Sequence, residues 1–91
     1  MASVDLTRHL TTLFPKLPAK LSIEAQTLAE LVGALEQLAP GIGFYICDER
    51  GRLRQHVNIF VDEVMLVDRK SLSDRLTASS RVFIVQALSG G

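Results

Sequence analysis

The sequence is short of several features that mark specialised proteins. A single cysteine in 91 residues excludes an internal disulfide and supplies no metal site on its own. The 10 lysine and arginine residues balance the 10 aspartate and glutamate residues, which argues against a general affinity for nucleic acid or anionic membranes. The chain also lacks an apolar run of membrane-spanning length, and residues 1–5 lack the pattern of a secretory signal. We therefore expect a cytoplasmic protein without nucleic-acid or membrane partners.

What is present is the composition of an ordinary globular protein. Hydrophobic residues make up 47% of the chain and charged residues 22%. A chain of 91 residues has room for one modest core and little else. We therefore expect one domain that folds on its own.

The amino-terminal part predicts two strands. Apolar side chains fall on alternate positions at Val4, Leu6, Leu10 and Phe14. This spacing favours a long, imperfect strand over residues 4–14. Two prolines, Pro15 and Pro18, then favour a turn, and residues 19–25 predict a second strand.

A helix is the clearest local prediction. Thr27-Leu28-Ala29-Glu30 matches a capping box, in which Thr27 accepts from first-turn amides and Glu30 reaches back to the Thr27 N–H. One apolar stripe follows at helical spacing, formed by Leu28, Leu31, Val32, Leu35 and Leu38. Pro40 and Gly41 end the helix.

The remaining chain alternates between turns and strands. Residues 42–47 fit either a short buried strand or an ordered loop, and an exposed turn follows over residues 48–52. Strands are predicted over residues 56–61, 64–67 and 81–88, with a tight turn at Asp62-Glu63. Between the last two strands, Leu72 and Leu76 anchor a short helical turn in a polar segment.

The order of these elements predicts an α+β fold. A mixed sheet of four to five strands is covered by one main helix. Residues 1–88 form the domain, and residues 89–91 form a flexible tail that ends in two glycines. A terminal Gly-Gly arises by chance in roughly one chain in two hundred, so its context must supply the meaning.

Two segments carry a family resemblance. The strand Val57-Asn58-Ile59-Phe60-Val61, and the final strand running into Ser89-Gly90-Gly91, resemble the MoaD/ThiS family of sulfur carrier proteins. The resemblance implies a ubiquitin-like β-grasp fold. The sequence departs from the family pattern at Asp62-Glu63, where Asn or Gly is frequent, and at Gln86 and Leu88 before the glycines. The subfamily therefore stays open.

What the resemblance implies is a carrier and not an enzyme. A ubiquitin-activating-type adenylating enzyme uses ATP to adenylate the Gly91 carboxylate. A sulfur donor protein then supplies the sulfur that replaces AMP. The resulting thiocarboxylate passes sulfide to an acceptor enzyme in cofactor or amino-acid biosynthesis, such as that of molybdopterin, thiamine or cysteine. The carrier itself binds no cofactor stably.

A partner surface is expected on one face of the sheet. If the aliphatic residues of both strands face the helix, then Phe60, Phe83 and Val85 share the opposite face. Ubiquitin-like domains that resemble this one meet their activating enzyme on such a patch, and Leu88 with the tail residues Ser89 and Gly90 extends the contact. The alternative is that the first strand or residues 42–47 cover these side chains as ordinary core.

No other residue forms a convincing catalytic or metal site. Cys47 has no base beside it in the sequence and is better explained as a buried thiol. His9 and His56 are too few to hold a metal. Asp48 and Glu49 are adjacent, and neighbouring side chains diverge on a turn or strand, so acid–base roles lack support.

Two other functions stay open beside the carrier. A protein modifier would join Gly91 to a lysine as an amide instead of forming a thiocarboxylate. A structural or adaptor β-grasp domain would carry its two glycines incidentally. The carrier and the modifier both begin with adenylation, so the sequence does not separate these two functions.

Overall fold

Five strands form one mixed sheet in the computed structural model, which describes residues 1–86 and leaves residues 87–91 outside the description. Their bounds are Ala2–Leu6 for β1, Lys20–Ile23 for β2, Val57–Val61 for β3, Val64–Met65 for β4 and Arg81–Gln86 for β5. The order across the sheet is β2-β1-β5-β3-β4. β1 and β5 are parallel, and the other neighbouring pairs are antiparallel.

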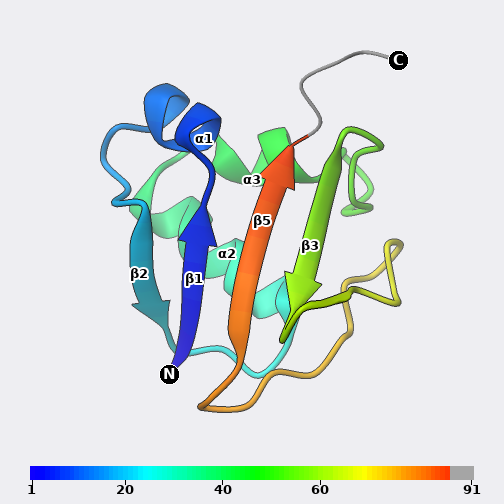
Figure 1. Cartoon of the computed structure of the whole chain (residues 1–91). Helices are drawn as coiled ribbons and strands as arrows, with labels where there is room; N and C mark the ends of the chain where they lie inside the picture. Colours follow the sequence, from blue (N-terminus) through cyan, green and yellow to red (C-terminus); the bar gives the residue numbers. More distant parts are fainter. Residues whose placement is uncertain (87–91) are drawn as a thin grey trace.

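Helices cover one face of this sheet. They are α1 at Arg8–Leu13, α2 at Leu28–Leu38 and α3 at Ile42–Ile46. In Figure 1, α2 crosses behind the sheet, and no described helix lies over β5 and β3 on the side turned to the viewer. We call these the covered face and the open face. None of the helices in residues 1–86 is long and apolar enough to span a membrane.

The core lies between α2 and the covered face. Val4, Ile59 and Ile84 of the sheet are 0% exposed, as are Leu31 and Leu35 of α2. Burying an aliphatic side chain of this size contributes about 1.5–3 kcal/mol relative to leaving it in water. The covered face therefore holds the helix and the sheet together.

The predicted start of the main helix is confirmed, with one change of partner. Thr27 is the N-cap of α2, and its Oγ1 accepts a hydrogen bond from the Glu30 N–H at 3.2 Å. The Glu30 carboxylate reaches back to the Gln26 N–H at 2.9 Å, one residue earlier than predicted. Both interactions satisfy backbone donors that a helix start leaves free.

The prediction of one long first strand over residues 4–14 is wrong in its second half. β1 ends at Leu6, and residues 8–13 form α1. The pairing between β1 and β2 ends with Asp5 opposite Lys20. Leu10 and Phe14 are four residues apart, a spacing that suits a helix as well as the alternation suits a strand. Leu10 is 1% exposed, and this burial fixes the helix on the domain.

Residues 42–47 are neither a strand nor a loop over most of their length, because residues 42–46 form α3. Ile42 and Ile46, four residues apart, are both 0% exposed and anchor one side of this helix. Its first turn is capped from α2, since the Glu36 carboxylate accepts from the Gly41 and Gly43 N–H groups at 3.0 and 2.7 Å. This cap comes from the preceding helix, so the local pattern does not reveal it.

The hairpin and the polar segment follow the prediction in part, because the second strand of the hairpin covers Val64–Met65 and not residues 64–67. Asp62 and Glu63 have positive φ angles of 51° and 70° and join β3 to β4 in a tight turn. Leu72 and Leu76 are 2% and 7% exposed and anchor the segment before β5. The Leu72 N–H donates to the Asp68 carbonyl at 3.0 Å and closes one turn. The expected helical turn does not form, because Leu72 has a positive φ of 53° and no helix lies between β4 and β5.

Candidate functional site

The open face carries the apolar side chains singled out in the sequence. Phe60 of β3 and Phe83 of β5 stand directly opposite each other in the antiparallel ladder, and Val85 follows on the same side of β5. All three are half-buried, whereas the intervening Ile59 and Ile84 are fully buried on the covered face. We call Phe60, Phe83 and Val85 the open-face patch. Neither the first strand nor α3 covers it as core.

One edge residue that the sequence interpretation missed extends the patch. Met65 of β4 stands opposite Phe60 and is 49% exposed. Val64 stands opposite Val61, so its side chain lies on the other side of the hairpin, where it is 65% exposed. Val67 follows after β4 and is 86% exposed. The sequence signal for these exposed residues was the apolar run over residues 64–67. A hairpin at the edge of a sheet can bury only some of the side chains in such a run. In this run only Leu66 is buried.

Charged and polar residues occupy the other half of the open face. Asp5 of β1 stands opposite Phe83, and Lys20 of β2 stands opposite Asp5. In the next row, Arg81 of β5 stands opposite Ser3. An apolar area bordered by charges of both signs is typical of a surface that meets another protein.

The tail begins at the end of β5. Gln86 is the last described residue of this strand, and its Oε1 accepts a hydrogen bond from the Tyr45 hydroxyl of α3 at 2.6 Å. The predicted site residues Leu88, Ser89, Gly90 and Gly91 lie outside the described residues. Their roles therefore stay predictions, and the structure contributes the position of the strand end from which they continue.

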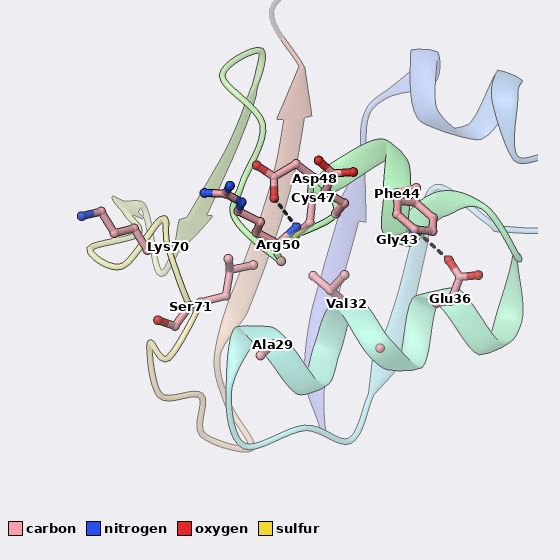
Figure 2. A pocket seen from close by; sticks show the side chains of 14 residues that line it. Ala29, Val32, Glu36, Gly43, Phe44, Cys47, Asp48, Arg50, Lys70 and Ser71 are labelled. Atoms are coloured by element: carbon pink, nitrogen blue, oxygen red, sulfur yellow. Dashed lines mark hydrogen bonds between the residues drawn. The ribbon is translucent and has the colours of Figure 1, made fainter.

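A separate cavity of about 680 Å³ opens on the helix side, between α2, α3 and residues 70–72 (Figure 2). Ala29, Val32 and Leu72 supply apolar lining, and Arg50 and Lys70 lie at its rim. Two of the three carboxylates that line it already accept hydrogen bonds from backbone N–H groups. Glu36 caps α3, and Asp48 closes the turn that follows α3.

Asp48 is held by the turn that follows α3. Its Oδ1 accepts from the Arg50 and Arg52 N–H groups at 2.9 and 3.0 Å. The hydrogen bond from the Arg52 N–H is the main cause that lowers the pKa of Asp48 below its ordinary value. An ionised carboxylate held in its own turn is poorly placed to donate a proton.

Cys47 is buried in the wall of the same cavity. It is 8% exposed and forms no disulfide. Burial, followed by the neighbouring negative charge of Asp48, raises the pKa of the Cys47 thiol. A protonated, buried thiol is a poor nucleophile, in agreement with the structural role that the sequence favoured.

The two histidines serve packing and hydrogen bonding. His9 Nε2 lies 3.0 Å from the Tyr45 hydroxyl, and the His56 ring packs edge-on against the Tyr45 ring at 5.8 Å. Within residues 1–86, no group of three histidine, cysteine, aspartate or glutamate side chains is arranged to hold a metal ion. The sequence missed Tyr45 because its partners are distant in the chain.

Comparison with known proteins gives a family. Residues 12–91 match the model of the ThiS family, a span that covers most of the chain and includes the terminal glycines. No curated protein sequence matches the chain.

Solved structures give the fold. The chain is similar to a chain of the Amycolatopsis orientalis BexX/CysO complex, with 18% identity, a TM-score of 0.85 and 100% of both chains covered. It is similar to Mycobacterium tuberculosis CysO, with 22% identity and a TM-score of 0.84 over 97% of this chain and 100% of that chain. Small archaeal modifier protein 1 of Methanosarcina acetivorans follows, with 18% identity and a TM-score of 0.80 over 99% and 95%. These likenesses confirm the predicted ubiquitin-like β-grasp fold.

Proposed function

The chain belongs to the ThiS family, and from this membership we propose that it is a sulfur carrier whose reactive group is the carboxylate of Gly91. The observation that carries the proposal is the family match over residues 12–91, which runs through the final Gly90-Gly91. In this function the protein is a substrate for other enzymes and not itself a catalyst. It needs no resident cofactor.

The chemistry of the proposal has two steps. An ionised carboxylate is a poor electrophile, so a partner enzyme first activates it. A carboxylate oxygen of Gly91 attacks the α-phosphorus of ATP, and pyrophosphate leaves. Hydrosulfide from a donor protein then attacks the carbonyl carbon, so that a C–S bond forms as the C–O bond to AMP breaks. The products are a thiocarboxylate and AMP, and the thiocarboxylate carries sulfur to an acceptor enzyme.

Recognition by the adenylating partner combines the tail with the open face. Glycine lacks a Cβ, so Gly90 and Gly91 suit a narrow channel and dihedral angles closed to other residues. The open-face patch offers half-buried aromatic surface without an occupant in residues 1–86, and such surfaces mark protein contacts. A partner that uses ATP also agrees with the expected cytoplasmic location.

Substitution of the terminal glycine tests the proposal. We expect Gly91→Ala to keep the fold and to slow adenylation about tenfold or more, the equivalent of about 1.4 kcal/mol or more in the barrier. ATP–pyrophosphate exchange by the adenylating enzyme of the same organism measures this rate. Gly33→Ala is the matched control, because a Cβ there meets nothing within 4 Å. Equal exchange rates for both variants would count against the proposal.

The mass of the natural protein tests the second step. The carrier isolated from its own cell should include a form that is heavier by the difference between a sulfur and an oxygen atom. Treatment with a thiol-alkylating reagent should add mass at Gly91 in that form alone. A carrier population with only the unmodified carboxylate, in cells that are actively making sulfur-containing cofactors, would contradict the proposal.

Conjugation to other proteins is the second candidate function. The likeness to a protein named small archaeal modifier protein 1 favours it. In that case Gly91 forms an amide with a lysine side chain, and trypsin, which cleaves after Arg81, leaves residues 82–91 on the modified lysine. Detection of this remnant on other proteins, without any thiocarboxylate form, would favour the modifier. Full function after removal of Gly90 and Gly91 would favour an adaptor.

A further inference from the structure

The end of β5 is the least paired part of that strand. Its parallel partner β1 ends with Leu6 opposite Ile84, whereas the antiparallel partner β3 continues to Val57 opposite Gln86. Val85 and Gln86 therefore have a neighbouring strand on one side only. Strand ends with a single partner open readily by local fraying, and this end leads into the tail.

Tyr45 supplies the missing support. Its hydroxyl donates to Gln86 Oε1 at 2.6 Å, across 41 positions of the chain, in a partly buried setting. The bond ties α3 to the last described residue of β5. α3 is itself anchored by Ile42 and Ile46, both 0% exposed, so Gln86 is attached to a fixed point of the core.

The Tyr45 ring is held from two separate segments, α1 with its C-cap residue Phe14 and the chain just before β3. Phe14 packs edge-on against it at 5.9 Å and 73°, and His56 does so at 5.8 Å and 83°. His9 Nε2 lies 3.0 Å from the hydroxyl. Aromatic edge contacts of this kind fix the orientation of a ring. We call Tyr45, these three neighbours and Gln86 the tail-root cluster.

The hydroxyl can serve both polar neighbours at once. A phenol has one proton to donate and lone pairs to accept with. When Tyr45 donates to Gln86, the oxygen accepts from a protonated His9 Nε2. The bond to Gln86 is therefore compatible with both the neutral and the charged form of the His9 ring.

From this arrangement we propose that Tyr45 is a positioning residue for the tail. Its hydrogen bond to Gln86 holds the end of β5 in place. The chain continues from this fixed point to Gly91, which the adenylating enzyme must reach. Five residues reach at most about 17 Å, so the position of Gln86 limits where the carboxylate can arrive. The inference rests on the proposed function, since it assigns a role in the same activation step.

A fixed strand end lowers the cost of binding. A tail whose root is already oriented loses less conformational freedom when it enters a partner's channel. Loss of the Tyr45 bond should therefore weaken binding and leave the chemical step unchanged once the tail is in place. In kinetic terms, KM for the carrier rises and kcat stays constant.

Tyr45→Phe is the primary test, because it removes the hydroxyl and keeps the ring with both edge contacts. With the adenylating enzyme of the same organism, we expect KM for the carrier in ATP–pyrophosphate exchange to rise about three- to tenfold, the net worth of one hydrogen bond. Hydrogen exchange at the Gln86 amide should accelerate by a similar factor. A thermal melt confirms that the variant folds.

Substitutions at Gln86 separate the bond from general damage. Gln86→Met keeps the length of the side chain without an acceptor and should reproduce the rise in KM. Gln86→Glu keeps an acceptor for the Tyr45 hydroxyl and should stay near the original KM when elevated salt screens its charge. The double variant Tyr45→Phe with Gln86→Met should be no worse than either single variant, because both remove one bond.

The outcomes distinguish this inference from the function on which it rests. If the unaltered protein is adenylated and Tyr45→Phe has the same KM, the positioning role is overturned and the carrier function stands. Additive losses in the double variant, or a Gln86→Glu protein as impaired as Gln86→Met, overturn it as well. If the unaltered protein is not adenylated at all, the proposed function fails and the positioning role fails with it.

Discussion

The two faces of the sheet use alternate residues of the same strands for different purposes. On β3 and β5, Ile59 and Ile84 face α2 and are 0% exposed. Their neighbours Phe60 and Phe83 face away from α2 and are only half-buried. The backbone places these side chains within a residue of each other, yet one pair is enclosed by protein and the other is available to a partner. Stability and recognition should therefore separate residue by residue.

The covered face should give the largest loss of stability. Ile59→Ala removes buried methyl and methylene groups and leaves a cavity, which costs about 2–5 kcal/mol in the free energy of unfolding. Urea denaturation followed by far-UV circular dichroism measures the change. A cost below about 1 kcal/mol would mean that α2 and the sheet close over the gap, and the contrast between the faces would be weaker than proposed.

The open face should give a large loss of partner binding with little loss of stability. Phe60→Glu leaves the core intact, and the cross-strand contact with Phe83 contributes only about 0.2–1 kcal/mol. A charge in the open-face patch should weaken association with the adenylating enzyme by about 2 kcal/mol, roughly thirtyfold. Isothermal titration calorimetry measures both association and its enthalpy.

Phe44→Glu is the matched control for this substitution. Phe44 is 66% exposed and lies on the helix side of the sheet, so the same chemical change is made away from the open face. Association should then be unchanged. If Phe60→Glu unfolds the protein, the open face belongs to the core. Equal weakening by both variants would show that charge alone is responsible.

The start of α2 should give an intermediate effect on the covered face. Thr27→Ala removes the acceptor for the Glu30 N–H and should lower the free energy of unfolding by about 1 kcal/mol. Glu30→Gln keeps an oxygen acceptor for the Gln26 N–H and should cost less. Chemical denaturation of both variants checks the ranking. A larger loss for Glu30→Gln than for Thr27→Ala would mean that Glu30 contributes more than Thr27 to the stability of this helix start.

The elements that sequence predicted correctly are those whose signals are local. The α2 helix has its cap and its buried stripe within one segment, from Thr27 to Leu35. Leu38, which was predicted to continue the stripe, is 52% exposed. β3 and β5 alternate cleanly, so the assignment of Phe60 and Phe83 to one face followed from register alone. The terminal glycines were likewise readable from the sequence, although the structure does not describe them.

The elements that sequence missed depend on distant partners. Residues 42–46 combine glycine with β-prone residues, and their helix is stabilised by Glu36 from α2 and by burial of Ile42 and Ile46. The link between Tyr45 and Gln86 was equally hidden, because Tyr45 is delivered by this same helix. A mistaken local structure thus concealed a residue near the root of the tail.

The smallest effect should come from the loop that completes the covered face, and it should depend on pH. Asp68 accepts from the Lys70, Ser71 and Ser73 N–H groups and from the Ser73 hydroxyl at 2.6 Å. The Ser73 hydroxyl is the main cause that lowers the pKa of Asp68 from 3.8 to about 2. The turn in question carries Leu72, whose carbonyl accepts from the Ala29 N–H in the first turn of α2.

The sign of the effect follows from the lowered pKa. Because the folded value lies below the unfolded one, the Asp68 carboxylate stabilises the protein above about pH 3.8, and this contribution is lost as the pH falls toward about 2. Asp68→Asn should therefore flatten the dependence of the melting temperature on pH across that window, with a small loss at neutral pH because the carboxylate is exposed. Thermal melts across the window, with one at neutral pH, measure the pH dependence and the loss.

Ser73→Ala should flatten the pH dependence partly, since the backbone donors to Asp68 remain. If the curves of melting temperature against pH are parallel for Asp68→Asn and the original protein, this loop does not contribute to the stability of the covered face. The stabilising unit would then consist of α2 and the sheet alone.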